Sequence, residues 1–245
     1  MVSWPEFKAR IRDFYTFSSQ EIIGLALSTI VAAFIFSFRD WGGAQFNLLT
    51  GLYHFLLLFL AAGIIFTFRF SCQKWYGLSE GYKVEYKPWW TGLVIALVIC
   101  FLSRGLIPLV LLGGVFVIFM SKQRLGEFRY GFSYWQNGTI SLWGIYSVMI
   151  TAILFTIGLR YFPQSYFFEK GVFISLITGL LTILPFPQQE GLNIYFAARW
   201  LYFVALGLVL LAAVLLLAGG TIGLIIAIII AAGLGIFSTL IGSEK

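Results

Sequence analysis

Long apolar runs recur along the chain, and shorter segments between them carry most of the charge. A helix needs about 20 apolar residues to cross a hydrocarbon core of about 30 Å, whereas a membrane barrel would alternate polar and apolar residues. These runs are continuous, so they predict helices. The runs long enough to cross are residues 21–38, 48–68, 139–159, 199–218 and 221–241. Shorter runs at 89–102, 106–120 and 171–186 predict re-entrant or broken segments.

The segments between the runs carry local signals of their own. Residues 4–15 place aromatic residues on one face and basic residues mostly on the other, which predicts an amphipathic helix in the headgroup layer. Ser18 and Glu21 have the spacing of a capping box at a helix start. "GYKVEYKP" alternates large and polar residues like a short strand. We divide the chain into an interfacial helix at 1–17, a transmembrane domain at 18–218 and an additional C-terminal transmembrane helix at 219–245.

Composition supports a membrane protein. Of the 245 residues, 60% are hydrophobic and only 11% are charged, and the mean hydropathy is +0.93. The predicted fold class is therefore an all-α integral membrane protein, a polytopic helical bundle with about six to eight transmembrane segments in the lipid bilayer. Cys72 and Cys100 lie in or beside apolar segments, which argues against a disulfide framework.

The net charge of +6 is distributed in a way that excludes a nucleic-acid partner. Lysines and arginines cluster in alternate loops, as the positive-inside rule describes for multi-pass proteins of the cell membrane. The rule predicts that the N-terminus and the loops at 69–88 and 121–138 are cytoplasmic.

The stretch "ILPFPQQEG" interrupts the apolar pattern after residue 182. Pro185 and Pro187 each remove a backbone donor and disfavour helix at the preceding residue, so the chain must bend here. An acid close to a membrane span marks a candidate functional site, and Glu190 is the acid in this stretch. We predict a polar cleft lined by Glu190, Gln188, Gln189 and Asn193. A solvated loop at the cytoplasmic interface is the structural alternative.

The same stretch resembles a known motif. "LPFPQQEG" aligns without a gap on the I-P-I-P-P-L-D-G type of motif in the site-2 protease family of intramembrane zinc metalloproteases, in which the aspartate is the third zinc ligand. "QKWYGLSEGYKVEYKPWWTGLVIAL", "QNGTISLWG" and "FSSQEI" resemble further segments of the archaeal branch, in the same order. The resemblance covers roughly residues 16–210. It implies a site-2-protease-like core, with Gly191 beside the carboxylate.

The catalytic part of the family pattern is missing. In H-E-x-x-H, two histidines one turn apart bind zinc and the glutamate activates the bound water. Counted back from Gln73, the corresponding positions hold Ile64, Ile65 and Phe68, and the single histidine of the chain is His54. We therefore predict no cofactor, with zinc expected only if the family chemistry were retained. Glu190 then needs another partner, for which Gln73, Arg69 or water in the cleft are the candidates.

The sequence leaves several functions open. The first hypothesis is a catalytically inactive site-2-protease-like protein that binds a transmembrane or amphipathic helix of a partner without cleaving it. An active metalloprotease with atypical ligands is the second. A small-solute or ion transporter is the third, because a proline-broken span with one acid is also used for coupling ions.

Overall fold

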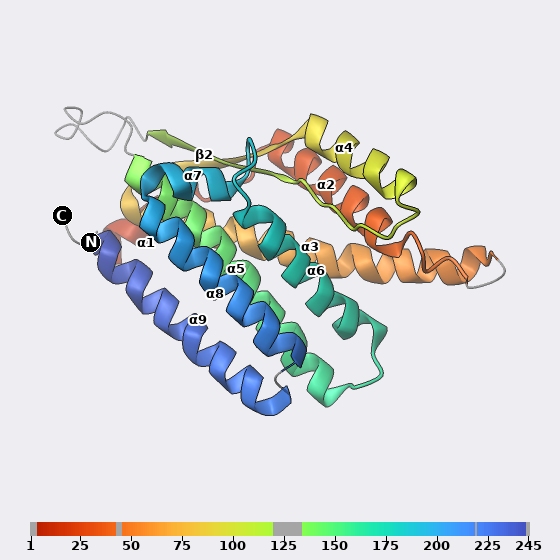
Figure 1. Ribbon diagram of the computed structural model, residues 1–245. Coiled ribbons are helices and arrows are strands. Elements are labelled where there is room, and N and C mark those ends of the chain that lie inside the picture. The colour runs from red at the N-terminus through yellow and green to blue at the C-terminus, as the bar shows by residue number, and fades with distance from the viewer. Residues whose placement is uncertain (1–3, 43–45, 120–133, 219, 244–245) are drawn as a thin grey trace.

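The computed structural model describes residues 4–42, 46–119, 134–218 and 220–243. Most of this part of the chain is helical (Figure 1). The helices are α1 (Trp4–Phe14), α2 (Ser19–Ser37), α3 (Leu48–Glu80), α4 (Trp90–Leu102), α5 (Tyr134–Tyr161), α6 (Tyr166–Ile183), α7 (Glu190–Ala197), α8 (Arg199–Ala218) and α9 (Gly220–Ser243). The strands are β1 (Tyr82–Pro88) and β2 (Gly113–Phe119).

Five of the described helices are long and apolar enough to cross a membrane: α2, α3, α5, α6 and α8. Two shorter apolar helical segments, α4 and Gly220–Gly233 of α9, add to the bundle. The chain is thus an all-α polytopic membrane protein, as its hydropathy predicts. Most of the run at 171–186 belongs to helix α6, which is long enough to cross, and only its last three residues lie beyond the helix end at Ile183.

Helix α5 is the centre of the bundle. It packs against α3, α6, α7, α8 and α9, and most of its side chains are buried. In Figure 1, α8 runs beside α5 while α3 crosses this group at a steep angle, and α9 packs against both α5 and α8. Because α5 contacts both α3 and α7, it forms one wall of the region around Glu190.

One predicted loop, at 69–88, and one predicted short span, at 106–120, are wrong. The segment 69–88 is not a loop, because α3 continues to Glu80 and only then gives way to β1. Its polar residues find partners inside the protein, so the helix does not have to end where the apolar run ends. The run at 106–120 is not a short span either. Gly113 and Gly114 disfavour a helix there, and the β-branched residues after them form β2.

The strand predicted from "GYKVEYKP" is confirmed as β1, and β2 is its antiparallel partner with Tyr82 opposite Phe119 and Pro88 opposite Gly113. One face of the hairpin is buried, as the alternation of Tyr82, Val84 and Tyr86 predicts. The Tyr86 hydroxyl donates to the Leu112 carbonyl at 2.7 Å. Burial raises the pKa of Tyr86 to about 12, so the hydroxyl remains a donor at neutral pH.

The entry to the first span follows its predicted chemistry. The Ser18 hydroxyl accepts from the Glu21 amide at 3.2 Å, and the Glu21 carboxylate accepts from the Ser18 amide at 2.8 Å. This reciprocal capping box satisfies amides at the start of α2. The helix expected before it is present as α1, and its place in the headgroup layer stays a prediction.

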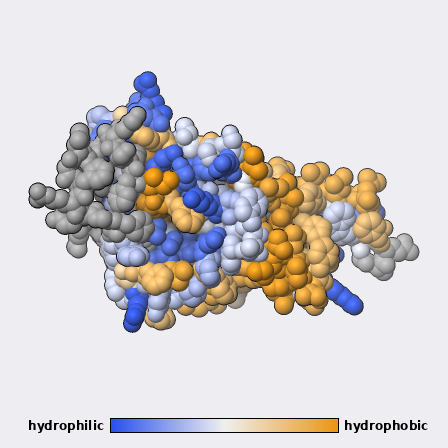
Figure 2. Space-filling view, turned by 90° about the horizontal axis from the view of Figure 1, so that it is seen from above, coloured by the Kyte–Doolittle hydropathy of each residue, from blue (hydrophilic) through white to orange (hydrophobic). Residues whose placement is uncertain are grey.

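Seen from the side of the hairpin, the surface has two parts. Hydrophilic side chains gather on the half that holds the ends of the chain and α7 in Figure 1, and hydrophobic side chains cover the half that holds α2 and α4 (Figure 2). Val94, Val98 and Phe101 of α4 are each at least half exposed. Such a continuous apolar surface suits contact with lipid tails.

Candidate functional site

The proline-broken stretch separates two helices. Helix α6 ends at Ile183 and α7 begins at Glu190, and both prolines lie in the turn between them. Gln188 adopts a left-handed conformation with φ of 59°. Gly191 is required by close packing, because a side chain there would collide with the Ile183 carbonyl oxygen. The bend therefore places Glu190 on the first turn of α7, pointing into the protein.

Glu190 pairs with two side chains of helix α3, Arg69 and Gln73. Its Oε1 atom lies 2.7 Å from Arg69 Nη2, 3.2 Å from Arg69 Nε and 2.6 Å from Gln73 Nε2. All three side chains are completely buried. Arg69 and Gln73 are one turn apart on α3, so both project toward the same carboxylate. A buried carboxylate needs such a cation, because desolvation makes an unpaired charge very costly.

The third wall of this cluster is Gly144 on α5. A Cβ atom there would collide with Gln73 Nε2 and with both carboxylate oxygens of Glu190. The polar groups are not fully satisfied among the described residues: Glu190 Oε2, Gln73 Oε1 and Arg69 Nη1 have no hydrogen-bond partner. Buried polar groups in native proteins are nearly always paired, so orphaned atoms beside an ion pair mark a candidate functional site.

The other predicted cleft residues lie on two sides of this cluster. Gln189 is buried, and its Nε2 atom has no partner within the described part of the chain. Asn193 donates to Ser141 Oγ at 3.2 Å. The exposed Gln188 and the half-buried Asn193 line an open groove of about 350 Å³, together with Tyr134, Asn137 and Gly114–Val117 of β2. The structure thus separates a sealed ion pair from an accessible polar groove.

The groove is bordered by the edge of β2 that pairs with no other strand among the described residues. The Trp89 amide donates to the Leu112 carbonyl at 3.2 Å, which fixes the hydrogen-bonding phase of the hairpin. In an antiparallel pair, alternate residues turn their N–H and C=O groups outward. By this alternation the backbone groups of Val115 and Val117 point away from β1. We find no hydrogen bond to them from the described residues.

Sequence reasoning did not find this strand edge, because β2 was predicted as part of a span. The paired glycines Gly113 and Gly114 were the available signal. Gly114 is required by close approach, since a Cβ atom there would lie 2.6 Å from the Gln188 carbonyl oxygen. Gly144 was also missed as a wall of the cluster.

The three residues that the resemblance aligns with the zinc-binding motif lie on α3 but outside the Glu190 cluster. Ile64 is 52% exposed and Phe68 is half-buried, whereas Ile65 is part of the hydrophobic core. His54 is near the other end of α3, where its Nδ1 atom lies 2.9 Å from the Asp40 carbonyl oxygen and its ring stacks on Tyr166 of α6. His54 is therefore a hydrogen-bonded histidine facing a neighbouring helix.

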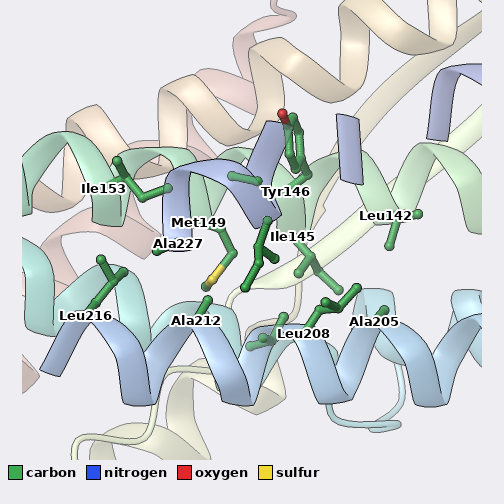
Figure 3. Close-up of a pocket in the computed structure, with 13 residues that line it drawn as sticks. Leu142, Ile145, Tyr146, Met149, Ile153, Ala205, Leu208, Ala212, Leu216 and Ala227 are labelled. Carbon is green, nitrogen blue, oxygen red and sulfur yellow. The ribbon is translucent and has the colours of Figure 1, made fainter. Parts of the chain in front are cut away.

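A second pocket is apolar. It lies between α5, α8 and α9 and is lined by residues such as Ile145, Met149, Ala212 and Ala227 (Figure 3). Its volume of about 30 Å³ is on the order of what one water molecule needs. Because the pocket is small and its lining is apolar, we interpret it as a packing gap under α9 and not as a catalytic or binding site.

The residues around Glu190 do not fit a zinc ion. Zinc sites use thiolate, imidazole and carboxylate ligands. The guanidinium of Arg69 has no lone pair to donate, and Gln73 directs its amide N–H toward Glu190. Within the described ranges, no group of three or more histidine, cysteine, aspartate or glutamate side chains is arranged to hold a metal.

Comparison with known proteins gives one relevant similarity. The chain is 26% identical over 185 residues to a protein of Methanocaldococcus jannaschii described as a putative zinc metalloprotease, and the match covers 72% of this chain and 84% of the relative. No family model and no solved structure matches the chain. The similarity supports a site-2-protease-like relationship for this membrane protein.

Proposed function

We propose that the chain is a catalytically inactive site-2-protease-like membrane protein that binds a transmembrane or amphipathic helix of a partner without cleaving it. The observation that carries the proposal is the pairing of Glu190 with Arg69 and Gln73. A hydrolase of this kind needs the carboxylate for a metal. Here the carboxylate is engaged by a permanent cation, so no group in the cluster activates water.

The groove beside the cluster supplies the binding part of the proposal. The outward backbone groups of Val115 and Val117 suit strand addition, in which an extended peptide pairs with an exposed sheet edge. The side-chain amides of Gln188, Asn137 and Asn193 face the same space. A partner helix that unwinds locally exposes backbone groups, and the groove offers hydrogen bonds that lipid cannot give.

The charge pattern extends the proposal to orientation. We place the protein in the cell membrane with its N-terminus on the cytoplasmic side, following the positive-inside rule. Helix α1 then lies in the cytoplasmic headgroup layer, and α9 serves as an additional C-terminal transmembrane helix.

Binding can be tested with the full chain purified in detergent micelles. The probes are two fluorescent single-span peptides, one with glycine and proline in its centre and one with a regular leucine-rich centre. We expect tighter binding of the first peptide and no cleavage of either in the presence of zinc, as measured by fluorescence anisotropy and mass spectrometry. Cleavage would overturn the inactivity, and equal binding of both peptides would overturn strand addition.

The strand edge provides a matched pair of variants. Val115→Pro removes an outward N–H and leaves the ladder to β1 intact, because proline is tolerated where the N–H points away from the partner strand. Val115→Ala keeps the N–H and controls for lost packing. One hydrogen bond corresponds to about a fivefold change in affinity, so the proline variant should bind the unwinding peptide about fivefold more weakly than the alanine variant.

A further inference from the structure

The Arg69–Gln73–Glu190 cluster has the layout of a metal site but the chemistry of an ion pair. Two residues one turn apart on α3 approach one carboxylate oxygen from α7. Zinc proteases place two histidines at this same spacing on a helix and take a third ligand from elsewhere. We propose that the Arg69 guanidinium is a built-in cation that takes the place of a metal ion, and that Gln73 takes the place of a neutral ligand.

The local charges are consistent with this replacement. A buried carboxylate is stabilised by a positive charge within reach, and the Arg69 guanidinium provides one at 2.7 Å. The amide of Gln73 donates to the same oxygen, as an uncharged amide can do beside a carboxylate. Gly144 keeps the third side open enough for the two side chains to meet the carboxylate.

The residue after Arg69 supports the same conclusion. In a zinc protease helix the residue that follows the first ligand is the glutamate base. Here that residue is Phe70, which is buried and packs its ring against Tyr86 at 4.1 Å between centroids. The Arg69 guanidinium lies 5.1 Å from the centre of the Phe70 ring. An aromatic ring at this place stabilises the cation and supplies no base.

The structure places the two positions that correspond to the zinc-binding histidines at 69 and 73. Counting back from Gln73 in the sequence placed them five residues earlier, at 64 and 68. The counted positions include Ile64, which is exposed, whereas Arg69 and Gln73 contact Glu190 directly. The two assignments predict different results when ligands are introduced. Geometry identifies 69 and 73 as the positions from which two imidazoles can reach a metal on Glu190.

The experiment restores ligands in the full chain. R69H/Q73H places two histidines opposite Glu190, and I64H/F68H is the matched control with the same substitutions at the counted positions. Folding is checked by size-exclusion chromatography and thermal unfolding. We expect stoichiometric zinc in R69H/Q73H by mass spectrometry and a tetrahedral absorption spectrum with cobalt. Both signals should disappear when E190A is added.

Several outcomes would overturn the proposal. One is a folded R69H/Q73H protein that binds no more zinc than the wild type, and another is equal binding by I64H/F68H. If R69H/Q73H does not fold, the wild-type ion pair is tested by comparing R69M, E190Q and R69M/E190Q. The proposal then requires that the double variant be more stable than either single variant, and equal or lower stability overturns it.

This inference rests on the metal-site layout and not on partner binding. A failed zinc experiment would leave the peptide-binding groove of the proposed function untouched. Equal binding of the two peptides would leave the ion-pair proposal untouched.

Discussion

Glu21 and Glu190 are both buried, and each pairs with a basic residue of α3, but they are bonded differently. Glu21 uses both oxygens: it lies 2.8 Å from Lys74 Nζ and accepts from the amides of Ser18 and Tyr86 at 2.8 and 2.9 Å. Glu190 directs its known contacts to Oε1 and leaves Oε2 without a partner among the described residues. Because both oxygens of Glu21 are bonded, this carboxylate connects neighbouring elements of the fold. The unpartnered Oε2 atom of Glu190 instead marks a candidate functional site.

The surroundings of the two bases differ as well. Lys74 also donates to the Thr16 carbonyl at 2.8 Å and lies 4.2 Å from the centre of the Phe17 ring. It therefore keeps partners when Glu21 is changed. Arg69 is completely buried and has Glu190 as its charged partner. Its charge therefore loses more stabilisation than that of Lys74 when the carboxylate is removed. The largest effects on stability are therefore expected at the Glu190 cluster.

The strongest test of the comparison breaks the inner ion pair. Glu190→Gln removes the negative charge that faces the buried Arg69 guanidinium. The variant leaves a buried arginine without its counterion, and the free energy of unfolding should fall by about 3–5 kcal/mol. Unfolding in mixed micelles titrated with a denaturing detergent measures the loss. A change within about 0.5 kcal/mol, typical of a surface position, would contradict the pairing.

A second prediction concerns the wall of the cluster. Gly144→Ala pushes a methyl group into Gln73 and the Glu190 carboxylate and should lower the free energy of unfolding by about 1–3 kcal/mol. Gly207→Ala in α8 is the matched control, because no atom lies within 4 Å of the new methyl group. The control should be neutral or stabilising by up to about 1 kcal/mol. Equal effects at the two glycines would rule out tight packing at Gly144.

The outer carboxylate should respond less. Glu21→Gln weakens the pairing with Lys74 but leaves an amide oxygen to accept from Ser18 or Tyr86. We expect a loss of about 1–2 kcal/mol in the same unfolding assay, because the lysine keeps its other contacts. A loss as large as that of Glu190→Gln would show that the two carboxylates have equivalent roles, against the comparison.

The smallest effect is expected at the helix cap. Ser18→Ala removes the side-chain acceptor of the Glu21 amide at the start of α2 and should cost about 1 kcal/mol. Ser18→Thr serves as the control, since it keeps a hydroxyl at the same place. If alanine and threonine behave alike in the unfolding assay, the capping bond contributes no stability.

Local chemistry made several elements predictable. The spacing of Ser18 and Glu21 predicts the cap, Pro185 and Pro187 predict the break, and the alternation in "GYKVEYKP" predicts β1. Each of these signals acts between residues close in sequence, so it needs no knowledge of the fold. The partner strand β2 was not predicted because its apolar residues fit a buried strand and a short span equally well.

The sequence by itself determined that this is a helical membrane protein, because apolar runs of spanning length have no stable place in water. It also determined that a bent segment ends in a carboxylate that needs a partner. Only the tertiary structure decided which partner that is, since Arg69 and Glu190 are far apart in the chain and meet through the packing of α3, α5 and α7. The same packing turns Ile64 outward and Arg69 inward, because helix phase is set by all the neighbours of α3 together.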